Sequence, residues 1–115
     1  MRLRLAATAA AGAFALLLSL PGSASAASGQ FTYVYADENG DPAVGRLFDP
    51  PSGVCLTLSE VADEATTPPA HSPRNRTDAV ATAFTGTDCT GDAFSMRPHT
   101  GYGSERLKLR SVFFS

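Results

Sequence analysis

Short segments in which apolar and polar residues alternate constrain the fold of this chain more than any other feature. In residues 30–36, QFTYVYA, the aromatic residues Phe31, Tyr33 and Tyr35 share one side of the alternation. Residues 54–61 and 105–115 alternate similarly, and in residues 78–86 threonine and phenylalanine favour a strand over the helix that the alanines would tolerate. Turn residues separate these segments, at 39–40, 50–53, 90–92 and 101–103. The sequence therefore predicts an all-β fold, a small antiparallel sandwich.

The closing segment 105–115, ERLKLRSVFFS, alternates leucines with basic residues. One continuous strand would place Phe113 on the leucine side, in the core, and Phe114 on the side of Lys108 and Arg110, outside it. Tyr102 and these two phenylalanines could instead form an exposed contact surface.

The first 26 residues have the organisation of a secretory signal peptide. Two arginines precede an apolar run from Leu5 to Leu20, and Ala24-Ser25-Ala26 is a small-residue cleavage site. The run is shorter than the roughly 20 residues of a bilayer span, and Pro21 ends it, so a retained membrane anchor is the weaker alternative. Cleavage after Ala26 would release residues 27–115 as a single secreted domain without membrane attachment.

The charge of residues 27–115 argues against nucleic acid as a partner. This part holds all 11 acidic residues and 9 − 2 = 7 of the basic ones, a net charge of 7 − 11 = −4. Phosphate neutralisation needs clustered lysines and arginines, and the Arg74-Asn75-Arg76 cluster is too small to supply them. We expect no nucleic-acid partner.

Cys55 and Cys89 are the only cysteines of the chain. A secreted domain of this size has a small core, so a covalent cross-link would help it fold, and an oxidising compartment favours one. Closing this loop stabilises the domain by about 4 kcal/mol in the chain-entropy model. A thiol nucleophile or half of a metal site would need a nearby histidine or a CxxC pair, and the sequence has neither. We therefore predict a disulfide between Cys55 and Cys89.

Asp37, Asn39 and Asp41 match the first half of a helix-loop-helix calcium loop. That loop then requires glycine at its sixth position and glutamate at its twelfth, where this chain has Pro42 and Phe48. An Asn-Gly pair flanked by aspartates suits a tight β-turn. The segment predicts a turn, and we expect neither a metal site nor a cofactor.

Residues 62–77, ADEATTPPAHSPRNRT, form a proline-rich segment with no apolar period. The sequence predicts an exposed loop, and a loop this long in a small domain is either functional or disordered. His71, Arg74 and Arg76 lie in it, and they are the residues we expect to contact a partner, an extracellular protein.

The order Glu64, Arg74, His99 resembles the acid, arginine and histidine of small secreted bacterial ribonucleases. Those three groups must converge as base, phosphate clamp and acid. The residues that flank these three do not match, and His71 and His99 are typical solvent-facing loop histidines. For Ser-His-Asp catalysis, the sequence has no supporting G-x-S-x-G stretch. We assign no catalytic residue, and a ribonuclease-like hydrolase remains the alternative.

An internal repeat emerges when the chain is compared with itself at an offset of 51 residues. Gly40 meets Gly91 without gaps, and the other matched pairs are Asp37/Asp88, Asp41/Asp92, Arg46/Arg97, Leu56/Leu107, Leu58/Leu109, Val61/Val112 and Tyr33/Phe84. The pairs fall at a strand end, in a turn and in a closing strand, which indicates a duplicated motif.

Residues 84–91, FTGTDCTG, resemble the Greek-key signature of the βγ-crystallin family. Phe84, Cys89 and Gly91 occupy its aromatic, second bulky and glycine positions. The resemblance implies two Greek-key motifs, each with a folded-over hairpin. The acidic pair that binds calcium in that family has no counterpart in LTLSEV or LKLRSV, which implies that the calcium site is absent.

Similar small secreted bacterial domains include proteinase inhibitors and killer-toxin-like proteins. The resemblance implies a non-catalytic binding protein that acts through an exposed loop, here residues 62–77. A passive structural protein of the cell envelope is a further alternative.

Overall fold

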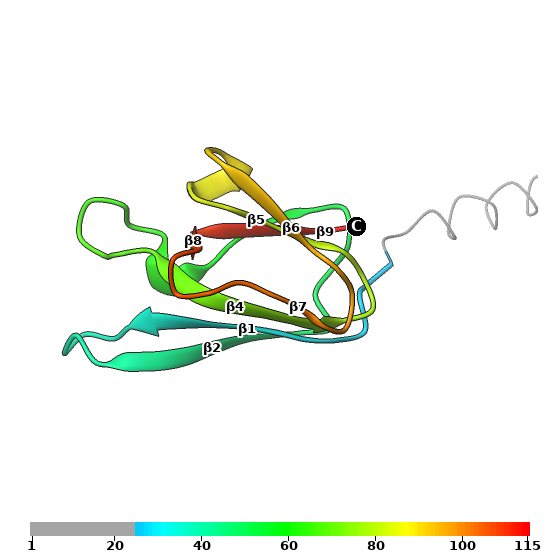
Figure 1. The fold of residues 1–115 in the computed structure, drawn as a ribbon. Coiled ribbons are helices and arrows are strands. Elements are labelled where there is room, and N and C mark those ends of the chain that lie inside the picture. Colours follow the sequence, from blue (N-terminus) through cyan, green and yellow to red (C-terminus); the bar gives the residue numbers. More distant parts are fainter. Residues whose placement is uncertain (1–24) are drawn as a thin grey trace, which may run out of the picture.

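Two antiparallel sheets face each other in the computed structural model, which describes residues 25–115 (Figure 1). All of the predicted signal peptide except Ser25 and Ala26 lies outside the described residues. The strands are β1 (Gly29–Ala36), β2 (Pro42–Phe48), β3 (Cys55–Thr57), β4 (Ala70–Thr77), β5 (Ala81–Phe84), β6 (Ala93–Met96), β7 (Gly101–Tyr102), β8 (Lys108–Leu109) and β9 (Ser111–Phe114). Two short 3-10 helices, η1 (Ser59–Val61) and η2 (Thr87–Cys89), complete the described elements. The predicted all-β antiparallel sandwich is confirmed.

Each half of the chain contributes strands to both sheets. The first sheet has the order β2-β1-β4-β7, with β8 also paired to β4, and the second has the order β3-β9-β5-β6. In the first half, β4 returns to pair with β1, which is the Greek-key order, whereas β3 pairs with β9 in the opposite sheet. In the second half, β9 returns to pair with β5, whereas β7 and β8 pair with β4. The two halves therefore have the same connectivity, and each lends its third strand to the sheet of the other.

The gap-free repeat holds at the hairpin turns and at the start of β2 and β6, but not in β1 and β5. Gly40 and Gly91 both have a positive φ, of 83° and 85°. However, five residues connect β1 to β2 and eight connect β5 to β6. Phe84 therefore pairs with Ala93 at the end of its strand, whereas Tyr33 lies opposite Gly45 within β1. The proposed equivalence of Tyr33 and Phe84 is wrong.

The repeat also misaligned the closing strands. Val61 lies in η1, whereas its proposed counterpart Val112 lies in β9, whose equivalent in the first half is β4. In the second half, β7 and β8 take the place of β3. Leu56 lies in β3, whereas its proposed counterpart Leu107 precedes β8, so this pair is also misaligned.

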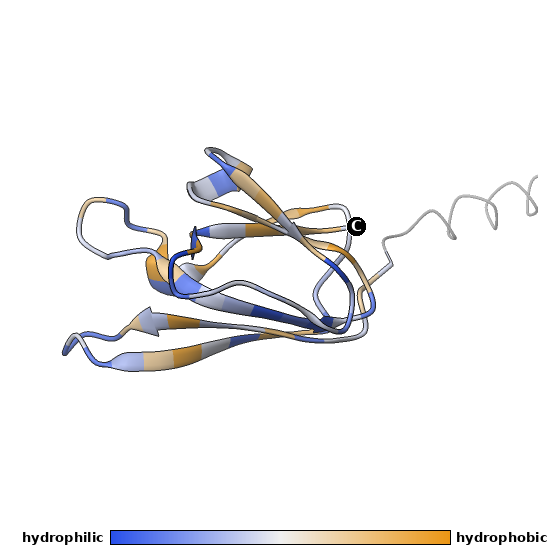
Figure 2. Cartoon of the chain, in the orientation of Figure 1, coloured by the Kyte–Doolittle hydropathy of each residue, from blue (hydrophilic) through white to orange (hydrophobic). Residues whose placement is uncertain are grey.

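The core lies between the sheets and is built from the inward residues of the strands. Phe31 of β1 and Phe114 of β9 meet edge to face across it, with ring centroids 5.4 Å apart. Figure 2 shows hydrophobic segments on the strands of both sheets. Leu58, Val61, Leu109 and Val112 are buried with these rings.

The prediction for Phe113 and Phe114 is wrong, because residues 105–115 do not form one strand. Arg110 separates β8 from β9 and turns inward, where its guanidinium donates to the carbonyl oxygens of Val61 (2.9 Å) and Thr67 (2.8 Å). This inward residue shifts the alternation by one position. Phe114 is therefore fully buried, and Phe113 is half-buried.

The predicted disulfide between Cys55 and Cys89 is confirmed, with the two Cα atoms 5.9 Å apart. It joins β3 to η2, which lies in the loop between β5 and β6. This loop folds back over the second sheet, because the Cys89 N–H donates to Ser111 Oγ (2.8 Å) and the Ser111 hydroxyl donates to the Gly86 carbonyl (2.6 Å).

Residues 62–77 differ most from the sequence prediction. Only 62–69 form a loop, whereas Ala70–Thr77 form β4, which pairs with β1 on one side and with β7 and β8 on the other. The strand was missed because its inward positions are Pro73, Asn75 and Thr77, which are fully buried but not hydrophobic. Pro73 is tolerated because the register between β1 and β4 shifts at this point.

Among the residues that the structure describes, we find no helix that could span a membrane.

Candidate functional site

The outer surface of the first sheet follows from its strand register. Paired residues of neighbouring antiparallel strands project to the same face, and Phe31 and Tyr33 of β1 point into the core. The outward positions are therefore Gln30, Thr32 and Val34 on β1, Val44, Arg46 and Phe48 on β2, His71, Arg74 and Arg76 on β4, Tyr102 on β7 and Lys108 on β8. We call these eleven residues the basic face.

The basic face carries cations without carboxylates. Three arginines and Lys108 occupy its positions, and no aspartate or glutamate does. Arg46, Thr32 and Arg74 form one row across three strands, which places the Arg46 and Arg74 Cα atoms about 10 Å apart. Arg74 and Arg76 project to the same side of β4, about 7 Å apart. Figure 2 shows this hydrophilic stretch in the second half of β4.

Exposed apolar side chains accompany these charges. Phe48 is 69% exposed, Tyr102 67% and Val44 51%. Arginine and aromatic residues are enriched in protein interfaces and supply much of their binding energy. The basic face therefore combines charges of one sign with exposed apolar side chains that are available for contact with a partner.

All three residues that the sequence singled out for partner contact belong to the basic face. They lie on a strand of the sheet, not in the exposed loop that we expected. His71 is half-buried, and its Nδ1 lies 2.8 Å from Ser72 Oγ. The sequence also named Tyr102 as a contact residue, and it is exposed on this face. Sequence reasoning missed Arg46 and Lys108, although the alternation of Val44, Arg46 and Phe48 in PAVGRLF was a signal for β2.

The residues of the ribonuclease alternative do not all converge. Arg74 and His99 line one hollow of about 200 Å³ together with Arg76, Thr100, Gly101 and Tyr102. Glu64 does not line it, and its carboxylate accepts the backbone N–H of Thr87 at 3.1 Å. No carboxylate lines this hollow, so it lacks the acidic residue that the ribonuclease pattern supplies as a base.

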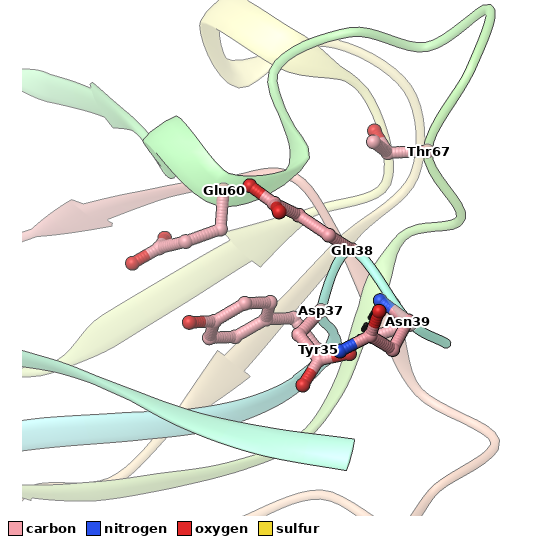
Figure 3. Close-up of a pocket in the computed structure, with 7 residues that line it drawn as sticks. Tyr35, Asp37, Glu38, Asn39, Glu60 and Thr67 are labelled. Carbon is pink, nitrogen blue, oxygen red and sulfur yellow. Dashed lines mark hydrogen bonds between the residues drawn. The ribbon is translucent and has the colours of Figure 1, made fainter. Parts of the chain in front are cut away.

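A larger hollow of about 470 Å³ lies between the β1–β2 turn, η1 and the 62–69 loop (Figure 3). Acidic and polar residues line it: Tyr35, Asp37, Glu38, Asn39, Glu60 and Thr67. The Tyr33 hydroxyl donates to Glu60 Oε1 at 2.7 Å nearby. Burial, followed by this hydrogen bond and the carboxylate charge, raises the pKa of Tyr33 well above its usual value.

The turn predicted at Asp37 is confirmed. Asp37 Oδ1 accepts the backbone N–H groups of Asn39 and Asp41, each at 2.9 Å. Within residues 25–115 no three histidine, cysteine, aspartate or glutamate side chains are grouped to hold a metal ion.

Comparison with protein-family models, with curated proteins and with solved structures finds no match to this chain.

Proposed function

We propose that this protein is a small secreted, non-catalytic binding protein that engages an acidic extracellular protein through the basic face. The strand register carries this proposal, because it gathers four cations and two exposed aromatic rings on one surface without a carboxylate. Residues 27–115 have a net charge of −4, and the basic face accounts for +4, so −4 − 4 = −8 lies elsewhere. An acidic partner would be attracted to this face and repelled from the others.

The same charge distribution favours a folded protein over a long polyanion. The Debye length is about 8 Å at physiological ionic strength, so a protein docked on the sheet mainly experiences the basic face. A nucleic acid or another extended polyanion would also run along the acidic surfaces. We therefore propose no nucleic-acid partner.

Three observations support the secretion and family parts of the proposal. The disulfide suits an oxidising compartment. The Ala27 N–H, which cleavage after Ala26 would convert into the new N-terminal amine, donates to the Pro50 carbonyl at 2.8 Å, so a mature N-terminus would stay anchored. The Greek-key order of both halves, together with Gly91 at φ 85° in a folded-over hairpin, supports the proposed relation to the βγ-crystallins.

The test is capture of extracellular proteins from the source culture, with the secreted, disulfide-bonded protein as bait. We expect an acidic protein to be captured by the natural protein and lost with Phe48→Ser/Arg74→Gln. The matched control is Val54→Ser/Arg106→Gln, which removes one exposed apolar side chain and one arginine outside the basic face. Capture of nothing, or equal loss in both variants, contradicts the proposal.

Two activity assays separate the alternatives. A captured protease whose activity falls at near-stoichiometric amounts would specify the binding function as inhibition. Cleavage of RNA by the purified protein that disappears in His99→Ala would replace the binding function with the hydrolase alternative.

A further inference from the structure

A small cationic hollow lies at the edge of the basic face, where β4 meets β7. Arg74 and Arg76 line it from β4, and His99 and Thr100 line it from the turn before β7. Tyr102 also lines it, and the volume is about 200 Å³.

The turn that carries His99 is held against β4 by buried hydrogen bonds. The fully buried Asn75 amide donates to the carbonyl oxygens of Arg97 (3.0 Å) and Met96 (3.3 Å). The His99 N–H donates to the Thr77 carbonyl at 2.8 Å. A Cβ atom on Gly101 would lie only 2.5 Å from the Arg97 carbonyl oxygen, so the backbone packs closely there. The wall of the hollow is therefore fixed before any ligand arrives.

The lining groups suit a doubly charged anion. Arg74 and Arg76 present two guanidinium groups from the same side of one strand. A guanidinium group can bind phosphate in a bidentate manner. The His99 ring and the hydroxyls of Thr100 and Tyr102 supply further donors. No carboxylate lines the hollow to neutralise the guanidinium groups.

A second hollow adjoins the first across Tyr102. Its volume is about 370 Å³, and it shares Thr100, Gly101 and Tyr102 with the cationic hollow. Phe94 of β6, which is 48% exposed, adds apolar surface. Phe94 and Tyr102 both line this hollow, and exposed aromatic side chains favour an aromatic ring as ligand.

We propose that the two hollows form one site for a small phosphate monoester that carries an aromatic ring. The phosphate occupies the cationic hollow, and the ring lies across Tyr102 in the hollow beside Phe94. A phosphate monoester fits better than a carboxylate because its second negative charge engages the second guanidinium. This site does not depend on the proposed protein partner.

The test is a titration of the secreted, disulfide-bonded protein with phenyl phosphate, inorganic phosphate and phenylacetate, followed by ¹H–¹⁵N NMR. We expect phenyl phosphate to shift the amides of residues 99–102 and to bind about tenfold more tightly than either other ligand. No shift of these amides by phenyl phosphate up to about 20 mM, or equal affinity for all three ligands, overturns the proposal.

Matched variants locate the two parts of the ligand. Arg74→Gln/Arg76→Gln should weaken phenyl phosphate binding about tenfold, whereas Arg46→Gln/Arg106→Gln, with the same change in net charge, should change it less than about twofold. Equal weakening in both would indicate general charge attraction and overturn the site. The spectra also show whether each variant is folded.

Phe94→Ser should reduce the affinity for phenyl phosphate to that for inorganic phosphate and leave inorganic phosphate binding unchanged. Unchanged phenyl phosphate binding in this variant overturns the assignment of the ring. Phe94 lies outside the basic face, so Phe94→Ser should still capture a protein partner, which separates failure of this site from failure of the proposed function.

Discussion

Asn75 stabilises the fold through a polar side chain that is fully buried in β4. Its Nδ2 group donates to the carbonyls of Ala79, Met96 and Arg97, and its Oδ1 accepts the hydroxyl of Thr77 at 2.7 Å. Asn75→Ala removes all of these buried hydrogen bonds at once, so we expect the free energy of unfolding to fall by about 3 kcal/mol. Urea unfolding measures this loss.

The neighbouring exposed residue provides the control for Asn75. Arg76→Ala should change the free energy of unfolding by less than about 0.5 kcal/mol. Losses of similar size in the two variants would mean that the Asn75 hydrogen bonds contribute little to the fold.

Tyr33 makes the free energy of unfolding depend on pH in the alkaline range. Its side chain is 2% exposed and donates to Glu60, and burial and this contact raise its pKa above the value of about 10 of an unfolded tyrosine. Below pH 10 the phenol is protonated in both states, and its contribution to stability is complete. Above pH 10 the unfolded chain releases the proton first, so the free energy of unfolding falls, by up to about 1.4 kcal/mol per pH unit.

Urea unfolding between pH 8 and pH 11 tests this effect. Tyr33→Phe has no phenol to titrate, so its stability should fall less steeply than that of the natural protein in this range. Parallel pH profiles would show that Tyr33 is not the source.

At the scale of elements, the disulfide joins two segments that are distant in the sequence. Cys55 of β3 and Cys89 of η2 are 34 residues apart, and closing such a loop restricts the unfolded chain. Cys55→Ala/Cys89→Ala should lower the free energy of unfolding by about 4 kcal/mol. Reduction of the natural protein should give a loss of the same size in urea unfolding, and a loss below about 1 kcal/mol on reduction would contradict this account.

The elements that could be predicted from sequence are those whose core residues are hydrophobic. The aromatic alternation around Phe31 identified β1, and the Asp and Gly residues identified the turn after it. β4 could not be identified in this way, because Asn75 and Thr77 are buried through hydrogen bonds to groups elsewhere in the chain. No local pattern encodes such partners.

The candidate site was predictable only in part for the same reason. The sequence singled out Arg74 and Arg76 as a local cluster of charge. Arg46 and Tyr102 join them through the pairing of β1 with β2 and of β4 with β7, which brings together residues far apart in the chain. Strand pairing of this kind is set by the whole sheet.

At the scale of the whole molecule, the distribution of charge matters more than its sum. A domain with a net charge of −4 presents a face of +4, so the net charge alone misrepresents what a partner meets on the first sheet. Association through this face should be oriented, and it should weaken as added salt screens the charges.

The most direct measurement is the affinity of the captured partner for two double variants of equal net charge. Arg46→Gln/Arg76→Gln removes two cations from the basic face, and Arg97→Gln/Arg106→Gln removes two from elsewhere. We predict that the dissociation constant rises at least about tenfold for the first variant and less than about twofold for the second. Equal weakening in both variants would show that the basic face does not bind the partner.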